Sequence, residues 1–387
     1  MGDPRSFVRR WPLSIRLTAV AVLILAVWVP ILHRWLWGPA PARVADARAW
    51  EWPVSTPEQQ GLDSKRLGEL VGLIREGNRY PGLHSLLVVR RGRLVVEEYF
   101  NGWSAERMHT LQSVSKSFTS ALVGIAIGRG ELKGTDERIL GFFPDAPRIA
   151  HLDERKASIR IEDLLTMRSG TDYHERGLGS PHAWLNLRPW GWDTFYLDRP
   201  MLAAPGTTFR YDSGGVILIS SLLRRRTGLH ADAYAERHLF RPLGIRKRAW
   251  LGNWAGHTHA GGGLYLTARD TARFGLLYLR NGRWADEQVV PEAWVRESFR
   301  RHVAFDAKGR GVVGYGYLWW VLAPDPNGSA PRDIYAAIGR MAQYVFVVPE
   351  HDMVVVVFGH TRAGADQGRP IEFLYSHILP AVRRPPA

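Results

Sequence analysis

Apolar and polar positions alternate in a way that predicts strands at both ends of the chain. Residues 83–90 and 93–100 are two β-rich runs around Gly92, which is a β-hairpin signal. Near the C-terminus, residues 343–348 and 353–358 are apolar runs on either side of a polar turn. We therefore expect a single antiparallel sheet that is assembled from the two ends of the chain.

Between these strands, the apolar residues follow a helical period. Residues 113–128 place Phe118, Leu122 and Ile125 on one stripe, and the pattern ends near two glycines. Asp63 is suited to cap a helix that reaches about residue 75. The expected fold class is therefore α+β, an antiparallel sheet flanked by helices together with a mainly helical subdomain. Further helices are expected at residues 161–167, 216–226 and 370–379.

The N-terminal segment has a different pattern. Residues 17–32 are an uncharged apolar run that follows four arginines, and Trp28, Trp35 and Trp37 lie where interfacial aromatic residues are expected. About 20 such residues can span a bilayer as a helix. We expect a single-pass membrane anchor with the N-terminus inside and the rest exported to the periplasm. The alternative is a signal peptide whose cleavage yields a secreted protein.

The domain organisation follows from the same pattern. Residues 38–60 are rich in Pro and Ala, which is typical of a linker. The expected parts are an anchor or signal segment at 1–37, a linker at 38–60 and one large domain at 61–382. The sequence contains no internal repeat or low-complexity tract.

Composition excludes several classes of function. The 387 residues include no Cys, which excludes thiolate chemistry and Cys-based metal sites. The formal net charge is +14, but the basic residues are scattered and no nucleic-acid-binding motif occurs, so we expect no nucleic-acid partner. His257 and His259 have the spacing of a metal-binding pair without an evident third ligand, so neither a metal nor another cofactor is expected.

One short segment carries the residue types of nucleophilic catalysis. Ser113 lies three residues before Lys116, one of only six lysines in a chain with 45 arginines. On a helix, this spacing places the two side chains on one face. A desolvated lysine amine can take the proton of a serine, whereas an arginine stays protonated below a pH of about 12. No G-x-S-x-G motif surrounds any serine, which argues against an α/β-hydrolase.

A second segment, FRYDSGG at residues 209–215, supplies a tyrosine and another serine. Serine hydrolases of the SxxK type pair their Ser–Lys couple with a proton-relaying residue on such a loop. Tyr211 and Ser213 match that pattern, and Ser213 is placed to hydrogen-bond Lys116 or a substrate carbonyl. Tyr99 and Asn101 also fit Y-x-N, but they precede Ser113 at the end of a predicted strand, so Tyr211 is preferred.

The order of these motifs resembles the serine β-lactamase-related hydrolases. This superfamily includes class C β-lactamases, DD-peptidases, penicillin-recognising esterases and nylon-oligomer hydrolases. The resemblance covers about residues 53–380 and implies a β-lactamase/transpeptidase-like fold, with the site between the sheet and a helical domain. The matching stretches are SVSKSFTS, IRIEDLLTMRSG, PGTTFRYDSGG, HLFRPLGI, GGGLYLTARDTARFG and QYVFVVPEHDMVVVV.

The resemblance also implies roles for individual residues. Ser113 is the acylated nucleophile and Lys116 is its base. Tyr211 protonates the leaving group and later activates water, while Ser213 stands at the Asn position of Y-x-N. The backbone N–H groups of Ser113 and Arg340 form the oxyanion hole.

The third motif of the family departs from its usual form. Ala337 stands where K-T-G or H-x-G has Lys or His, while Gly339 is kept. The missing charge weakens the case for β-lactam turnover, and Gln343 after this motif is more similar to the nylon-oligomer and carboxylesterase branch. Gly339, Gln343, Trp190 and Trp192 are the residues expected to line the substrate pocket.

The expected function is that of a membrane-anchored serine hydrolase that cleaves amide or ester bonds of small molecules through an acyl-enzyme. The alternatives are a β-lactamase or DD-carboxypeptidase with a peptidoglycan-derived substrate, and a non-catalytic penicillin-binding relative. The sequence leaves the substrate and the oligomeric state open.

Overall fold

The computed structural model describes residues 42–44, 50–77, 79–145, 148–177, 179–306, 311–324, 334–361 and 367–383. The expected anchor at 1–37 lies outside these residues and stays a prediction. None of the helices in the described ranges combines the length and the apolar character that crossing a membrane requires.

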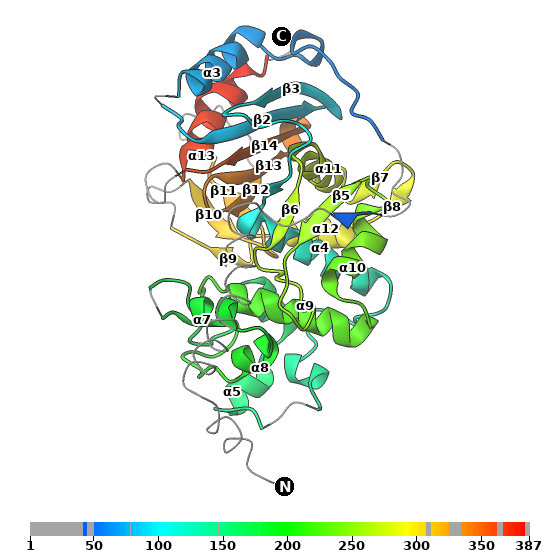
Figure 1. The fold of residues 1–387 in the computed structure, drawn as a ribbon, viewed down its shortest axis with the longest axis vertical. Coiled ribbons are helices and arrows are strands. Elements are labelled where there is room, and N and C mark those ends of the chain that lie inside the picture. The colour runs from blue at the N-terminus through cyan, green and yellow to red at the C-terminus, as the bar shows by residue number, and fades with distance from the viewer. Residues whose placement is uncertain are drawn as a thin grey trace, which may run out of the picture. The chain divides into compact units, whose positions relative to one another are not determined.

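The large sheet is built from both ends of the chain, as the apolar pattern predicts. Its eight strands lie in the order β3-β2-β14-β13-β12-β11-β10-β9, and each pairs antiparallel with its neighbours (Figure 1). The strands are β2 (Leu83–Arg90), β3 (Arg93–Tyr99), β9 (Val303–Ala304), β10 (Val312–Tyr315), β11 (Trp320–Leu322), β12 (Ile334–Gly339), β13 (Gln343–Val348) and β14 (Met353–Gly359).

Two smaller sets of strands lie outside the large sheet. Strand β6 (Leu264–Leu266) pairs with both β5 (Lys247–Trp250) and β4 (His109–Thr110), and β7 (Arg283–Trp284) pairs with β8 (Glu287–Gln288). Strand β4 matters for function because it leads directly into the segment with Ser113. A further short strand is β1 (Ala42–Arg43).

Helices fill most of the chain between the two halves of the large sheet. The α-helices are α3 (Ser64–Glu76), α4 (Ser115–Gly128), α5 (Glu154–Ser158), α6 (Ile161–Leu165), α7 (Pro181–Leu187), α8 (Trp192–Leu197), α9 (Ser213–Thr227), α10 (Ala231–Ala235), α11 (Ala268–Leu279), α12 (Glu292–Phe299) and α13 (Arg369–Phe373). Shorter helical turns are η1 (Glu58–Gln60), η2 (Gln112–Val114), η3 (Ile139–Phe142), η4 (Glu236–Phe240), η5 (Pro349–His351), η6 (Leu374–Ile378) and η7 (Leu379–Ala381).

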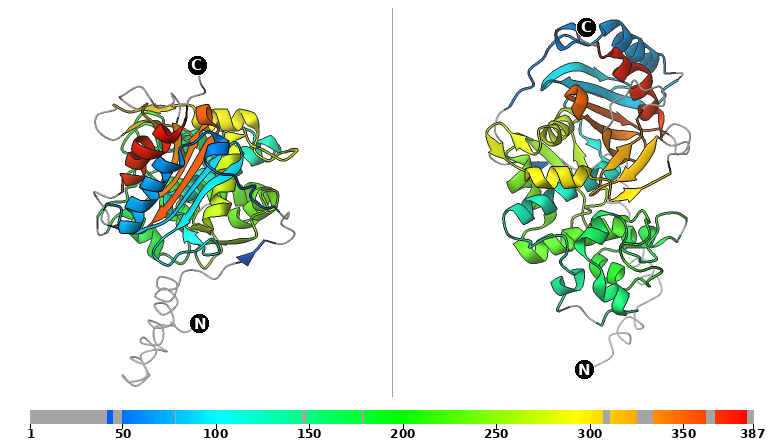
Figure 2. Two further views of the ribbon diagram at one scale, coloured as in Figure 1. Left: turned by 90° about the horizontal axis from the view of Figure 1, so that it is seen from above. Right: turned by 180° about the vertical axis from the view of Figure 1, so that it is seen from behind.

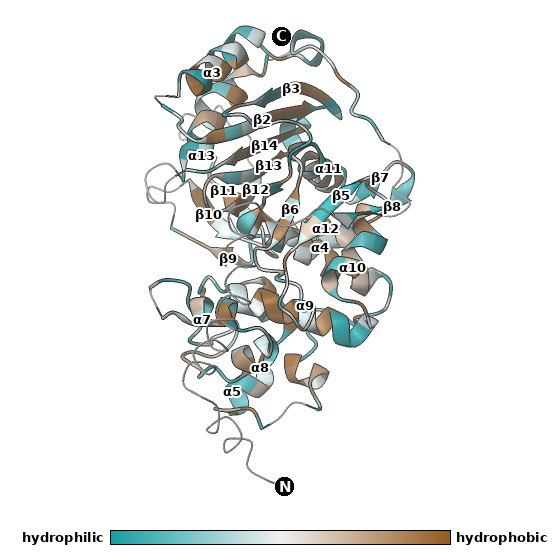
Figure 3. Cartoon of the chain, in the orientation of Figure 1, coloured by the Kyte–Doolittle hydropathy of each residue, from teal (hydrophilic) through white to brown (hydrophobic). Residues whose placement is uncertain are grey.

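The central strands are apolar at nearly every position because helices cover both faces of the sheet. In β14, Val355 and Val357 pack with the core under α3 and the C-terminal helices, whereas Val354 and Val356 pack with the core that includes α4 and α11. Figure 2 shows α3 and the C-terminal helices on one side of the sheet, and Figure 3 shows the apolar character of its strands.

The predicted elements are found with small shifts at their ends. Asp63 caps α3 by accepting hydrogen bonds from the backbone N–H groups of Lys65 and Arg66. The hairpin between β2 and β3 turns through Arg91 and Gly92, both with positive φ, as a tight two-residue turn requires. The helix predicted from residue 113 begins at Ser115 instead, because residues 112–114 form a tighter turn.

Residues 50–60, the end of the predicted linker, lie against the domain. Leu94 of β3 makes backbone hydrogen bonds to this segment on both sides of Val54. Its N–H donates to the Pro53 carbonyl, and its carbonyl accepts from the Ser55 N–H. Trp52 is buried there. The mainly helical part of the chain, with α5 to α9, lies beyond β9, the strand at one edge of the large sheet (Figure 1).

Candidate active site

Ser113 lies in a preformed turn between β4 and α4. Gln112, just before it, has a left-handed backbone with a φ of 47°, a conformation that non-glycine residues seldom adopt. Thr110 supports this geometry, because its hydroxyl accepts hydrogen bonds from the backbone and the side-chain amide of Gln112 at 3.3 and 3.0 Å. The hydroxyl of Ser115 donates to the Gln112 carbonyl at 2.6 Å. The turn therefore holds Ser113, which lines a cavity, in one place.

Lys116 lies in the first turn of α4, and its side chain is almost completely buried. Its Nζ is 2.9 Å from Ser113 Oγ and 2.5 Å from the carbonyl oxygen of Gly261. Burial lowers the pKa of this amine to about 8; the carboxylates of Glu175 and Asp212 act against that shift, and the Arg340 guanidinium adds to it. A substantial fraction of neutral amine at physiological pH is what a general base requires.

Tyr211 lies beside both Lys116 and Ser113. The Lys116 Nζ is 4.9 Å from the centroid of the Tyr211 ring, and this ring stacks on Trp320. Burial raises the pKa of Tyr211 well above its ordinary value, and the negative charge of Glu175 adds to this effect. The phenol is therefore neutral at rest and can serve as a proton donor. Tyr99, the alternative in the sequence, instead donates a hydrogen bond to Glu97 at 2.6 Å on β3.

Asp212, between Tyr211 and Ser213, fixes the start of α9. Its carboxylate accepts hydrogen bonds from Gly215 N–H at 2.8 Å and from the Tyr196 hydroxyl at 2.5 Å. Burial raises the pKa of this carboxyl to about 6. The sequence interpretation gave Asp212 no role, although an Asp directly before an apolar helical run is a recognisable N-cap.

Ser213 and Glu175 form a contact that could not be predicted from the sequence. The backbone N–H of Ser213 donates to Glu175 Oε1 at 2.9 Å, and both residues line the cavity. Of the two partners expected for the Ser213 hydroxyl, Lys116 is not bonded to it in the described residues, where Lys116 bonds to Ser113 and Gly261 instead. A hydrogen bond from Ser213 to a substrate carbonyl stays a prediction. Gly261 packs directly on Ser213, since a Cβ at Gly261 would lie 3.0 Å from the Ser213 carbonyl oxygen.

Strand β12 approaches the Ser113 turn at Gly339. A Cβ on this glycine would lie only 2.5 Å from the carbonyl oxygen of Leu111, so no other residue fits without displacing the strand. Ala337, two residues earlier, is buried in the core that contains α4. Arg340 follows Gly339, has an exposed side chain and lines the cavity. The N–H groups of Ser113 and Arg340 remain the predicted oxyanion hole.

Gln343 does not line the cavity, contrary to the sequence-based expectation. Its side chain is fully buried, and its Nε2 donates to the carbonyl oxygens of Arg340, Met341 and Gly359 at 3.2, 2.9 and 2.6 Å. These bonds hold the turn between β12 and β13, where Met341 and Ala342 have positive φ. Gln343 therefore shapes the site indirectly, by holding the turn that presents Arg340.

The cavity beside Ser113 has a volume of about 240 Å³. Trp190 and Trp192, which we expected in its wall, are not among the residues that line it. Trp190 is 66% exposed, whereas Trp192 is buried and its ring lies nearly perpendicular to that of His259, with 5.6 Å between the ring centroids. The lining consists of Gln112, Ser113, Glu175, His182, Asn186, Ser213, Leu251, His259, Gly261, Gly262, Gly263 and Arg340.

A chain of hydrogen-bonded polar side chains forms part of the cavity wall. His259 Nε2 contacts Asn186 Oδ1 at 2.8 Å, Asn186 Nδ2 contacts His182 Nε2 at 3.1 Å, and His182 Nδ1 contacts the Tyr173 hydroxyl at 2.9 Å. His257 contacts Ser221 at 3.1 Å instead, so the two histidines of the pair bond to different partners. In the described ranges, no group of three or more potential ligands is arranged to hold a metal ion.

Comparisons with known proteins agree with this geometry. The Beta-lactamase family model matches residues 70–374. The chain is 26% identical over 290 residues to the 6-aminohexanoate-dimer hydrolase of Paenarthrobacter ureafaciens, covering 70% of this chain and 71% of that protein.

Solved structures share the fold at lower identity. A candidate 6-aminohexanoate-dimer hydrolase from Bacillus anthracis is 19% identical with a TM-score of 0.70, covering 88% of this chain and 90% of that one. The octameric penicillin-binding protein homologue from Pyrococcus abyssi is 18% identical with a TM-score of 0.63, covering 81% of this chain and 78% of that one. With the buried Ser–Lys pair and the family match together, the chain belongs to the Beta-lactamase family and is a serine hydrolase.

Proposed function

We propose that this enzyme hydrolyses an amide or ester bond of a small molecule through an acyl-enzyme on Ser113. The observation that carries the proposal is the 2.9 Å contact between the Ser113 hydroxyl and the buried amine of Lys116. A serine paired with a desolvated base in this way is an activated nucleophile.

In acylation, the Ser113 Oγ attacks the carbonyl carbon of the substrate while its proton moves to the neutral Lys116 Nζ. The oxygen of the tetrahedral intermediate takes the negative charge and accepts hydrogen bonds from the N–H groups of Ser113 and Arg340. Each such donor lowers the barrier by about 3 kcal/mol. The C–N or C–O bond then breaks, Tyr211 gives its phenolic proton to the leaving group, and the Lys116 ammonium restores the proton of Tyr211.

In deacylation, a water molecule attacks the acyl carbon. Its proton passes through Tyr211 to Lys116, and the bond to Ser113 Oγ breaks as that oxygen regains a proton. The net reaction consumes one water and releases an acid and an amine or alcohol. The residues of the chain supply every proton transfer, so the scheme needs no cofactor.

The substrate is proposed from two features. The relative from Paenarthrobacter ureafaciens is named for hydrolysis of a 6-aminohexanoate dimer, which supports amide cleavage here. The buried Ala337 leaves no charged side chain at the first position of the third motif, which favours an esterase or amidase. The alternative is a β-lactamase or a DD-carboxypeptidase that acts on peptidoglycan-derived substrates.

Labelling experiments test the proposed function. A fluorophosphonate and a fluorescent penicillin are applied to the wild type, to Ser113→Ala and to Lys116→Ala. We expect fluorophosphonate labelling of the wild type alone. No labelling by either probe would refute the catalytic proposal, and labelling that survives Ser113→Ala would show that another serine reacts. Slow release of bound penicillin would favour the penicillin-binding alternative instead.

We also propose that residues 17–37 anchor the enzyme in the cell membrane, with residues 61–382 on the extracytoplasmic side. The apolar run, the four arginines before it and the tryptophans at its end support this location. The proposal predicts that the full chain stays in the membrane pellet after extraction at alkaline pH. A soluble product whose N-terminus begins after residue 37 would favour signal cleavage and secretion.

A further inference from the structure

The carbonyl that binds Lys116 belongs to a glycine-rich segment, residues 257–263, whose sequence is HTHAGGG. Glycines alone do not hold a loop in one conformation, because they have the greatest freedom in the unfolded chain. In this structure, backbone hydrogen bonds to Leu251 and Asn253 and side-chain contacts from other elements together fix this segment. The 145 positions that separate Lys116 from Gly261 make their contact wholly dependent on tertiary structure.

The side chain of Thr258 attaches the segment to α10. Its hydroxyl accepts a hydrogen bond from the backbone N–H of Asp232 at 3.2 Å and donates one to Asp232 Oδ1 at 3.3 Å. Its carbonyl accepts from the Ser220 hydroxyl at 3.0 Å, and the next carbonyl but one, at Ala260, accepts from Thr119 at 3.0 Å. Thr258 is buried, so these bonds are shielded from competing water.

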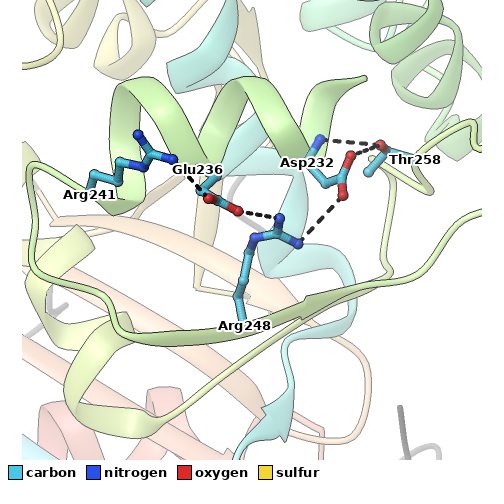
Figure 4. Close-up of polar contacts among 5 residues, drawn as sticks. All are labelled: Asp232, Glu236, Arg241, Arg248 and Thr258. Carbon is cyan, nitrogen blue, oxygen red and sulfur yellow. Dashed lines mark hydrogen bonds and ion pairs between the residues drawn. The ribbon is translucent and has the colours of Figure 1, made fainter. Parts of the chain in front are cut away.

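Asp232 is held in turn by an ion-pair network that joins α10 and η4 to β5 (Figure 4). Arg248 lies 3.5 Å from Asp232 Oδ2 and 2.7 Å from Glu236 Oε2, and its side chain is only 10% exposed. Arg241 contacts the other oxygen of Glu236 at 3.2 Å. Figure 4 shows that Arg248 links the two carboxylates, whereas Arg241 reaches only Glu236 and is remote from Thr258.

We propose that Thr258, Asp232 and Arg248 are positioning residues that fix the Gly261 carbonyl and, through it, aim the Lys116 amine at Ser113. This set is called the Thr258 clamp below. A neutral amine has two N–H groups and one lone pair. When one N–H donates to Gly261, the rotation about the terminal bond of the lysine is set, and the lone pair is left to accept the Ser113 proton. The inference rests on the proposed function, because it concerns how the general base of that reaction is aligned.

The pH dependence offers a signature that a purely structural role would not produce. The Gly261 carbonyl stabilises the charged form of Lys116, so moving it away lowers the pKa of the lysine further. The rate falls because the amine is misaligned, while the acidic limb of the pH profile moves to lower pH. The other charged or titratable groups that face Lys116 are left in place; they are Glu175, Asp212, Arg340, Tyr211, His182 and His259.

The test compares Thr258→Val, which removes the hydroxyl and keeps the shape, with Thr258→Ser, which keeps the hydroxyl. Asp232→Asn is a second variant of the clamp, and Arg241→Met is a matched control in the outer arm of the same network. For each protein, the rate of acylation by a fluorophosphonate, kcat and KM for an activated ester, the pH profile and Tm are measured.

Thr258→Val loses both hydrogen bonds between its hydroxyl and Asp232, and we expect it to reduce acylation and kcat about tenfold, with KM within twofold of the wild type. Its acidic limb moves to lower pH, Thr258→Ser restores most of the rate, and Arg241→Met retains it. Equal losses of acylation rate in Thr258→Val and Arg241→Met, or a lower Tm of Thr258→Val without a change in its rate, would overturn the proposed role of the Thr258 clamp. The proposed function would remain intact. A wild type that no probe acylates would refute both.

Discussion

The protonation of Lys116 should control the rate at which Ser113 is acylated, because only the neutral amine can accept the serine proton. Burial brings the pKa of this amine from 10.5 to about 8. About a tenth of the molecules then have a neutral Lys116 at pH 7, roughly 300 times the fraction for an exposed lysine. We therefore expect acylation to rise roughly fivefold between pH 7 and pH 8 and to level off near pH 9.

Two substitutions should move this profile in opposite directions. Glu175→Gln keeps an oxygen for the Ser213 N–H but removes the negative charge that favours the ammonium, so it lowers the pKa of Lys116 and moves the acidic limb to lower pH. Arg340→Gln removes a positive charge that disfavours the ammonium, so it moves the limb to higher pH. The Arg340 backbone N–H is retained in that variant.

The assay is the second-order rate of labelling by an uncharged fluorophosphonate from pH 5 to pH 9.5 at constant ionic strength. The cavity histidines cannot account for a limb near pH 8, because burial lowers the pKa of His182 and brings that of His259 to about 4. A flat profile, a limb near pH 6.5, or shifts of the same sign in both variants would refute the assignment of Lys116 as the base.

Three further outcomes follow from the contacts of the site. Lys116→Met should abolish acylation. Because burial lowers the pKa of Lys116, the unfolded wild type binds more protons than the folded one between pH 8 and 10.5, so its free energy of unfolding, measured with urea, should rise by on the order of 3 kcal/mol relative to the variant across that window. Gly339→Ala forces β12 away from Leu111, so it should slow acylation at least tenfold and lower the Tm. The control is Gly72→Ala, where a Cβ meets nothing within 4 Å, and it should stabilise the protein by about 0.5–1 kcal/mol. Arg340→Gln should reduce the preference for an ester that carries a carboxylate over its neutral isostere several-fold, as measured by the ratio of the two kcat/KM values, and an unchanged ratio would show that the guanidinium does not contact the substrate.

Features that depend on neighbouring residues could be predicted from the sequence. The Ser113–Lys116 pair is such a feature, because three residues are less than one helical turn and bring the two side chains together in any fold that keeps the turn. The hairpin around Gly92 and the cap at Asp63 are equally local. The two-ended sheet was also predicted, since strands at both ends of the chain bury their apolar side chains most economically by pairing in one sheet.

The misplaced pocket residues show the limit of that reasoning. The resemblance of the third motif to the nylon-oligomer and carboxylesterase branch points to Gln343 as a pocket residue. Aromatic character and a position before the tyrosine motif point to Trp190 and Trp192. In the structure, Gln343 holds a turn, Trp192 is buried beside His259 and Trp190 faces solvent, because side-chain direction depends on the exact course of the backbone. His182 and Asn186 carried no signal in the sequence, since α7 places them at the cavity only by its packing.

The sequence by itself determined that a serine and a lysine meet on one helical turn and that Tyr211 is available as their partner. Only the tertiary structure decided what surrounds the lysine: the Gly261 carbonyl, the Glu175 and Asp212 carboxylates and the Arg340 guanidinium. These groups come from separate segments, and their effects depend on distance and on the exclusion of water. Motif spacing singles out this lysine, but the packing that buries it lowers its pKa to about 8, as the proposed role of general base requires.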